Sequence, residues 1–156
     1  MDSNKMKEGR FFYEGCPIVC YGFFTLKGSM QGREVNIIIN LNYNENYISI
    51  DLANQLLIPQ QNIIEKKDIF QIKELQVTID EYDYISQFYV INMYQEEVGI
   101  VIGLPWFKSL GTFILNMEKK FVTFPYKEKL ITLQDTTSKT DSVTLEDFND
   151  ISSNTS

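Results

Sequence analysis

Apolar residues recur at every second position through most of the middle of this chain, and β-branched and aromatic residues dominate among them. This period places alternate side chains on opposite faces of an extended strand. It predicts strands over residues 21–30, 34–40, 69–79, 85–92, 99–103, 112–116 and 121–124. Many short strands separated by turn signals roughly every 8–12 residues are typical of an all-β barrel or sandwich.

One segment departs from this alternation and favours a helix. Residues 50–57 place apolar side chains at helical spacing, Ser49 or Asp51 can cap the first turn, and Pro59 ends the helix. A further helical turn is compatible with residues 104–110. Three consecutive isoleucines, Ile37 to Ile39, instead indicate a strand that is buried on both faces.

The composition fits one folded domain with polar ends. The chain has 156 residues, of which 44% are hydrophobic and 13% aromatic, enough to bury a core. We interpret residues 1–15 as a polar N-terminal tail, residues 16–133 as the domain, and residues 134–156 as an acidic, disordered C-terminal tail. A short helix that docks on a partner stays an open alternative for four apolar residues of that tail, Val143, Leu145, Phe148 and Ile151.

Charge and the missing histidine exclude several classes of function. The net charge of −7 disfavours binding to phosphate backbones, so we expect no nucleic-acid partner. The absence of His excludes Ser-His-Asp and Cys-His nucleophiles, His-ligated zinc and a histidine general base. Carboxylates, Lys, Tyr, Ser, Thr and two thiols remain available for chemistry.

The two cysteines indicate neither a metal site nor a disulfide. Cys16 and Cys20 cannot by themselves supply four zinc ligands, and a disulfide across so short a loop is geometrically awkward. We expect reduced thiols in an intracellular protein, with no metal and no cofactor. The sequence shows no signal-peptide pattern and no apolar run of the ~20 residues that cross a bilayer, so we expect no membrane association.

Two blocks of sequence resemble the retropepsin-like aspartic proteases, particularly the protease domains of Ty3/gypsy-type retrotransposon polyproteins. In that family a strand ends in Asp-Ser/Thr-Gly-Ala and leads through a loop to a hydrophobic helix. Residues 35–59 follow this frame, and Asn46-Tyr-Ile-Ser followed by Asp51-Leu-Ala resembles the family's Asn-Phe-Ile-Ser and Asp/Glu-Leu-Ala. Residues 99–107, Gly-Ile-Val-Ile-Gly-Leu-Pro-Trp-Phe, resemble the family's Val-Ile-Leu-Gly-Met-Asp-Trp-Leu.

The resemblance covers residues 21–125 and implies a small closed retropepsin-like barrel, all-β with one short helix. It also implies that Ile39 and Gly103 line the cleft or support it, together with Trp106, which we expect in the core. Retropepsins are homodimers in which each subunit contributes one catalytic loop, so a homodimer is the implied assembly. The implied ligand is an extended peptide or a protein segment.

The departure from the family falls on the catalytic positions. Asn40 occupies the place of the catalytic Asp, and Leu41 and Asn42 replace the Ser/Thr and the Gly that follow it. Aspartic proteases need two carboxylates that share a proton, and an amide cannot accept the proton of the attacking water. Leu41 cannot donate the bracing hydrogen bond, and Asn42 adds bulk where glycine allows a tight turn. We therefore expect no catalytic residue here.

The chain also lacks a counterpart of the glycine-containing flap of the active proteases. The chain has no Gly between Arg33 and Val98, whereas a mobile flap uses glycines at its tip. The matching segment falls within residues 66–79. A flap that is merely shortened stays open as an alternative.

Other acidic and aromatic residues offer weaker candidates. Asp51 is as compatible with helix capping as with catalysis, and Glu96-Glu97 is compatible with a loop. The acidic run Asp80, Glu81 and Asp83 is typical of a solvated hairpin tip rather than a calcium site. Strand propensity accounts for four tyrosines, although tyrosine is also frequent at interfaces: Tyr82, Tyr84, Tyr89 and Tyr94.

The sequence thus predicts a catalytically inactive aspartic-protease-like domain that binds a peptide or a protein, or that serves dimerisation. Two alternatives stay open: an active endopeptidase with carboxylates elsewhere, and a heterodimer with an Asp-bearing relative. The identity of the partner does not follow from the sequence.

Overall fold

The computed structural model of the chain describes residues 10–12, 15–22, 24–95 and 97–136. These residues form ten strands, two short α-helices and one 3-10 turn in the following order: β1 Phe24–Met30, β2 Arg33–Ile39, β3 Tyr47–Ser49, α2 Ile50–Gln55, η1 Gln60–Asn62, β4 Ile63–Lys66, β5 Ile69–Ile79, β6 Tyr82–Ile91, β7 Ile100–Ile102, α3 Leu104–Leu110, β8 Ile114–Asn116, β9 Phe121–Tyr126 and β10 Lys129–Gln134.

Two-residue turns with positive φ at both positions join three hairpins, and the β5–β6 turn has one such residue. In the β9–β10 turn these residues are Lys127 and Glu128, with φ of 49° and 66°. Gln31 and Gly32 connect β1 to β2 with φ of 50° and 78°, and Lys67 and Asp68 connect β4 to β5 with φ of 51° and 64°. Asp80, at φ 53°, begins the turn between β5 and β6. Such turns match the right-handed twist of the paired strands, which is why they favour Gly, Asn and Asp.

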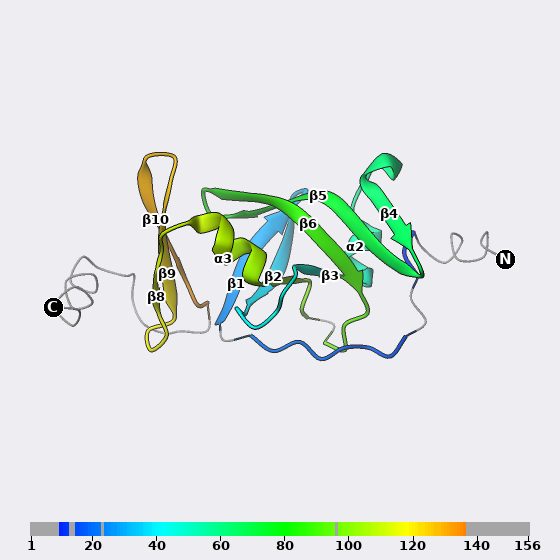
Figure 1. The fold of residues 1–156 in the computed structure, drawn as a ribbon, viewed down its shortest axis with the longest axis horizontal. Helices are drawn as coiled ribbons and strands as arrows, with labels where there is room; N and C mark the ends of the chain where they lie inside the picture. The colour runs from blue at the N-terminus through cyan, green and yellow to red at the C-terminus, as the bar shows by residue number, and fades with distance from the viewer. Residues whose placement is uncertain (1–9, 13–14, 23, 96, 137–156) are drawn as a thin grey trace, which may run out of the picture.

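Six strands close into a barrel. The seven-stranded sheet has the order β1-β2-β7-β3-β6-β5-β4, and β5 also pairs with β1. Two of the pairings, β2 with β7 and β3 with β6, are parallel. Their strands are brought together from distant parts of the sequence, whereas β1–β2 and β5–β6 are local hairpins (Figure 1). The predicted all-β, closed retropepsin-like barrel is therefore confirmed.

The isoleucine run of β2 packs on both faces, as predicted. Ile37 and Ile39 are fully buried in the main core inside the barrel. Ile38 points the other way into a second, smaller cluster with Cys20, Met93 and Val101. A central strand with both faces covered explains why its sequence is continuously apolar instead of alternating.

A small three-stranded sheet and α3 complete one end of the molecule (Figure 1). Trp106 of α3 is fully buried, and its ring lies edge-on to Phe124 of β9 at 5.7 Å between centroids. Its Nε1 donates a hydrogen bond of 2.8 Å to the hydroxyl of Tyr82 in β6. After β10, Thr136 donates its backbone N–H to Thr25 O, so the chain returns to the start of β1.

The sequence missed several short elements. The structure adds β3, β4 and β10 to the predicted strands, ends the helix that begins at residue 50 at Gln55, and gives α3 seven residues rather than a single turn. Phe11, within the predicted polar tail, is buried with 2% of its surface exposed and packs edge-on against Phe70. The domain limits stay a prediction, and most of the predicted C-terminal tail, residues 137–156, lies outside the described residues.

We expect the substitution Trp106→Ala to lower the free energy of unfolding by about 3–5 kcal/mol, because it removes a fully buried indole and leaves a cavity. Urea denaturation monitored by circular dichroism measures this loss. Tyr82→Phe is the matched control for the hydrogen bond alone, at about 1–3 kcal/mol for the unsatisfied indole N–H. A loss below about 1 kcal/mol for Trp106→Ala would contradict this role for Trp106 in the core.

Candidate functional site

Asn40 lies immediately after β2, where the chain leaves the barrel. Its backbone N–H donates to Ile102 O at 3.0 Å, so it continues the parallel pairing of β2 with β7 by one residue. The loop then turns at once, with Tyr43 N donating to Asn40 O at 3.3 Å. The structure thus brings the two sequence blocks together at this point.

The side chain of Asn40 is bound at both ends. Its Oδ1 accepts a hydrogen bond of 2.9 Å from Asn42 N, a local turn within the loop. Its Nδ2 donates a bond of 2.8 Å to Tyr21 O, in a segment that precedes β1. An aspartate at this position has only acceptor oxygens when ionised, so it would place a negative oxygen against the Tyr21 carbonyl. The amide therefore has a structural role that a carboxylate cannot take over.

Leu41 and Asn42 supply no chemistry of their own. Leu41 is half-buried and packs against the main core, and Asn42 is exposed. Asn42 is not among the residues with positive φ, so the loop has a turn that does not require the conformational freedom of glycine.

Gly103 and Asn46 fix the loop to the second block. Asn46 is 1% exposed, its Oδ1 accepts from Gly103 N at 2.9 Å, and its Nδ2 donates to the Tyr84 hydroxyl at 2.9 Å. A Cβ on Gly103 would lie 2.5 Å from both Tyr43 O and Glu45 O, a distance that real Cβ atoms do not show. The sequence motif includes Asn46, but no role was predicted for this residue. The available signal was an amide side chain inside a segment that matches the family frame.

Residues 16–22, here called the N-terminal strap, cross the outside of the Asn40 loop. Ile18 forms a parallel bridge with Met93, and Gln95 binds both backbone groups of Cys20 through its side-chain amide, at 3.2 and 2.7 Å. Tyr21 N donates to the hydroxyl of Tyr43 at 2.7 Å. In Figure 1 the segment runs along one edge of the barrel. Sequence reasoning did not predict this contact, because nothing in the strap's composition marks its partner.

A small apolar pocket lies on the other side of the loop. It has a volume of about 220 Å³ and is lined by Glu45, Tyr47, Ile69, Tyr89, Val90 and Ile91. The ring of Tyr47 contacts Tyr43 at 6.1 Å and Tyr89 at 6.2 Å between centroids, forming an aromatic row along one wall. Ile69, 51% exposed, comes from the start of β5, just after the glycine-free Lys67-Asp68 turn. The turn and the β5 strand of this β4–β5 hairpin fall within residues 66–79, the range expected for the flap, whereas most of β4 precedes it.

Two titratable side chains beside the loop, Tyr47 and Cys20, stay protonated at neutral pH. Burial, with a smaller effect of the charge of Glu45, raises the pKa of Tyr47 above the usual 10.0 of a phenol. Burial also raises the pKa of the Cys20 thiol above 9.0, although a hydrogen bond with Tyr43 opposes the shift. Neither group can act as a general base near neutral pH.

The other acidic candidates lie away from the loop or are occupied in structural roles. Asp51 is exposed on α2, and the Ser49 hydroxyl, not Asp51, caps that helix by accepting from Leu52 N. In the β5–β6 hairpin, Glu81 forms an ion pair of 2.6 Å with Lys129, and Asp83 accepts from the Thr78 hydroxyl. Glu97 is an exposed loop residue, whereas Glu96 lies outside the described residues.

Among the residues described, no group of acidic or sulfur side chains is arranged to hold a metal ion. No helix in the same part of the chain is both long enough and apolar enough to span a bilayer.

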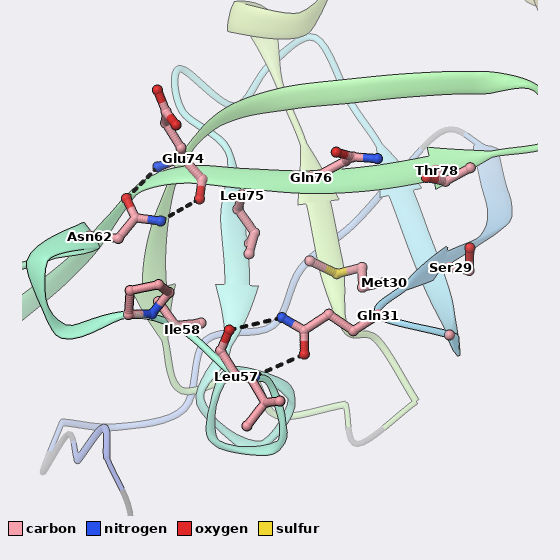
Figure 2. A pocket seen from close by; sticks show the side chains of 12 residues that line it. Ser29, Met30, Gln31, Leu57, Ile58, Asn62, Glu74, Leu75, Gln76 and Thr78 are labelled. Carbon is pink, nitrogen blue, oxygen red and sulfur yellow. Dashed lines mark hydrogen bonds between the residues drawn. The ribbon is translucent and has the colours of Figure 1, made fainter.

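A larger cavity lies at the opposite end of β2 from Asn40, about 20 Å along the strand. It measures about 390 Å³ and follows the seam where β1 and β5 pair only through Ser29 and Thr78. Figure 2 shows two side-chain amides closing this seam, Gln31 on the backbone of Leu57 and Asn62 on the backbone of Glu74. We interpret this cavity as a place where the barrel closes incompletely, and not as a ligand site. The side-chain amides of Gln31 and Asn62 are already hydrogen-bonded to the backbone of the same chain.

The barrel and its loop define a retropepsin-like fold, and comparison with solved structures shows the same. The chain is similar to the retroviral protease-like domain of Ddi1 from Leishmania major, with a TM-score of 0.52 and 15% identity over 72% of this chain and 91% of that one. It also matches a retropepsin-like aspartic protease from Rickettsia conorii, with a TM-score of 0.47 and 10% identity over 70% and 80% of the two chains. No protein-family profile and no curated protein matches the sequence. The likeness to the Ddi1 domain shows the fold alone.

We expect Gly103→Ala to destabilise the domain by about 1–3 kcal/mol, because the added methyl group overlaps two backbone oxygens that cannot rotate away. Gly99→Ala, four residues earlier, is the matched control, since its nearest neighbour is the flexible end of the Leu52 side chain at 2.8 Å. Thermal unfolding compares the two variants. Equal stability of both would show that the close approach at Gly103 does not constrain the loop.

We expect Asn40→Asp to loosen the N-terminal strap while leaving the barrel folded. Loss of the donor to Tyr21 O makes the amides of Ile18, Cys20, Tyr21 and Tyr94 exchange about tenfold faster, the factor that corresponds to ~1.4 kcal/mol for one hydrogen bond. Hydrogen exchange followed by NMR resolves these sites. Asn44→Asp adds the same charge at an exposed position of the same loop and should leave their exchange unchanged. Unchanged exchange in Asn40→Asp would show that the amide does not hold the strap.

Proposed function

We propose that this chain is a retropepsin-like domain, derived from a retrotransposon protease, that has lost catalysis and works as a peptide- or protein-binding module. The observation that carries the proposal is the amide of Asn40 at the position of the catalytic carboxylate, hydrogen-bonded on both sides by its own chain. The two sequence blocks, at residues 35–59 and 99–107, support the retrotransposon origin.

The chemistry of the loop supports inactivity. Hydrolysis by an aspartic protease requires one carboxylate to take a proton from water while a second protonates the carbonyl oxygen. Asn40 can hold a water molecule but has no titratable group, and Leu41 and Asn42 add none. Tyr47 and Cys20 remain protonated because burial raises the pKa of each. Positions 40–42 therefore offer no proton acceptor, and the one carboxylate of the loop, Glu45, lies on the wall of the apolar pocket instead of at the position of the catalytic Asp.

The pocket and the neighbouring strand edge support peptide binding. An apolar pocket of about 220 Å³ accommodates one aliphatic or aromatic side chain, and Glu45 on its wall favours a peptide with a nearby basic or polar group. β4 ends the seven-stranded sheet and pairs there only with β5, so its other edge is available for an added strand. The edge of β4 and the pocket are two separate features, with β5 between β4 and the β6 residues of the pocket, and each can bind part of an extended peptide.

We also propose a homodimer in an intracellular setting. Retropepsin-like proteins meet at the loop that corresponds to residues 40–42, and apolar side chains are exposed beside it here: Ile18, Val19, Tyr21 and Tyr94, the last two at 71% exposure. Such a patch favours contact with another protein surface. Cys16 and Cys20 are free thiols, in agreement with a reducing compartment. Analytical ultracentrifugation of the full chain tests the dimer.

We expect the purified chain to show no pepstatin-sensitive cleavage of a peptide library between about pH 4 and 7, the range of shared-proton carboxylates. Loss of general acid–base assistance alone removes about 10²–10⁴ in rate. We expect the Asn40→Asp variant alone to show no cleavage either. The new carboxylate faces the Tyr21 carbonyl, and Leu41 has no hydroxyl group that could donate a hydrogen bond to it. The triple variant Asn40→Asp, Leu41→Ser, Asn42→Gly has the better prospect of activity.

Cleavage by the native chain that pepstatin blocks would contradict the proposal. In that case Glu45→Gln is the informative variant, since Glu45 is the carboxylate that lines the pocket next to the loop. Loss of cleavage in Glu45→Gln would support the active endopeptidase instead.

A further inference from the structure

We propose that residues 18–21 are an intramolecular ligand: they occupy the cleft beside Asn40 and must leave before an extended peptide can pass along the loop. The proposal rests on the proposed binding function and adds its regulation. The surface concerned, here called the strap groove, consists of Asn40, Tyr43 and residues 92–95.

The strap groove binds the strap mainly through the backbone of the strap. Six hydrogen bonds connect the groove to strap residues 18–21. Ile18 N donates to Asn92 O at 2.8 Å and Tyr94 N donates to Ile18 O at 2.9 Å. The other four involve side chains of the groove. Gln95 accepts from Cys20 N and donates to Cys20 O. Asn40 donates to Tyr21 O, and the Tyr43 hydroxyl accepts from Tyr21 N.

Side chains of the strap contribute little to this contact. Only Cys20 is buried, at 3% exposure, whereas Ile18, Val19 and Tyr21 expose 44%, 41% and 71% of their surfaces. Binding through main-chain groups is the mode by which proteins accept extended peptides of varied sequence. The groove can therefore accept another extended segment once this one has left.

The strap groove and the apolar pocket adjoin each other at Tyr43 and Tyr47. Tyr43 binds Tyr21 N through its hydroxyl, and its ring contacts Tyr47, which lines the pocket. Ile91 also lines the pocket, and the next residue, Asn92, accepts the hydrogen bond from Ile18. A peptide with one side chain in the pocket that continues toward Asn40 therefore meets the strap.

The covalent link favours the strap over a free peptide. Phe11, before the strap, is anchored in the core, and Gly22, after it, lies so close to β2 that a Cβ would be 2.0 Å from Ile38 Cγ2. A segment held between two such points has an effective concentration in the millimolar range. A peptide at micromolar concentration cannot displace it unless its intrinsic affinity is correspondingly higher.

The test uses the full chain with the strap weakened and the groove intact. The double variant Ile18→Pro, Tyr21→Pro removes two backbone donors of the strap, because proline has no N–H. Val19→Pro is the matched control, since the Val19 N–H takes part in none of the six hydrogen bonds. The probe is a fluorescein-labelled peptide with the sequence of residues 16–22, Cys-Pro-Ile-Val-Cys-Tyr-Gly, kept reduced and followed by fluorescence anisotropy.

We expect the double variant to bind the probe at least tenfold more tightly than Val19→Pro or the native chain, and a scrambled peptide not to bind. The Tyr94 amide should exchange fast in the double variant and slow down again when the probe is added. Tyr21→Pro alone provides a milder release if the double variant does not fold.

Equal affinity of native and released chains would overturn the proposal, as would a folded, released chain that does not bind the probe. Either failure leaves the prediction of catalytic inactivity untouched, because the probe assay involves no hydrolysis. Pepstatin-sensitive cleavage, in contrast, would overturn the proposed function without changing the strap's exchange rates.

Discussion

The buried amide of Asn46 is the contact on which the candidate site depends. It joins the loop after β2 to the backbone of Gly103 and to the Tyr84 hydroxyl in β6, so one side chain connects three segments that are far apart in sequence. Its backbone oxygen also accepts from Tyr89 N at 2.9 Å. Leaving either buried partner unsatisfied costs about 1–3 kcal/mol, so this contact stabilises the loop whatever residue stands at position 40.

The residues that hold the frame and the residues at positions 40–42 are different sets of atoms. Gly103, Asn46 and the isoleucines of β2 and β7 form the barrel and are fixed by packing, whereas Asn40, Leu41 and Asn42 lie beyond the strand end. An amide at position 40 is isosteric with a carboxylate but adds a donor. That donor binds Tyr21 O, a contact that is unfavourable for an ionised carboxylate.

Local patterns predicted most of the barrel, but contacts that depend on tertiary structure escaped them. Alternation identified β5 from Ile69 to Ile79, and the apolar run of β2 indicated burial on both faces. β3 has three residues, too few for a periodic signal, and three of the four residues of β4 are exposed. β10 buries Ile131 and Leu133 in alternation, but it is short and was missed. The position of Asn40 followed from the sequence frame, whereas its hydrogen bond to Tyr21 did not, because a polar side chain's partner 19 residues away leaves no periodic signal.

Under the proposed loss of catalysis, the site beside Asn40 does not have to stay open to substrate, and the strap can lie against it. An active protease must keep its carboxylates accessible to substrate and water, so any internal segment bound there reduces turnover. Once residue 40 is an amide, this constraint disappears, and main-chain groups of the same chain can satisfy the donors and acceptors of the loop. Two of the six hydrogen bonds to the strap come from the loop, through Asn40 and Tyr43, and the other four come from residues 92–95. The donor of the Asn40 amide thus links the proposed loss of catalysis to the contact with the strap.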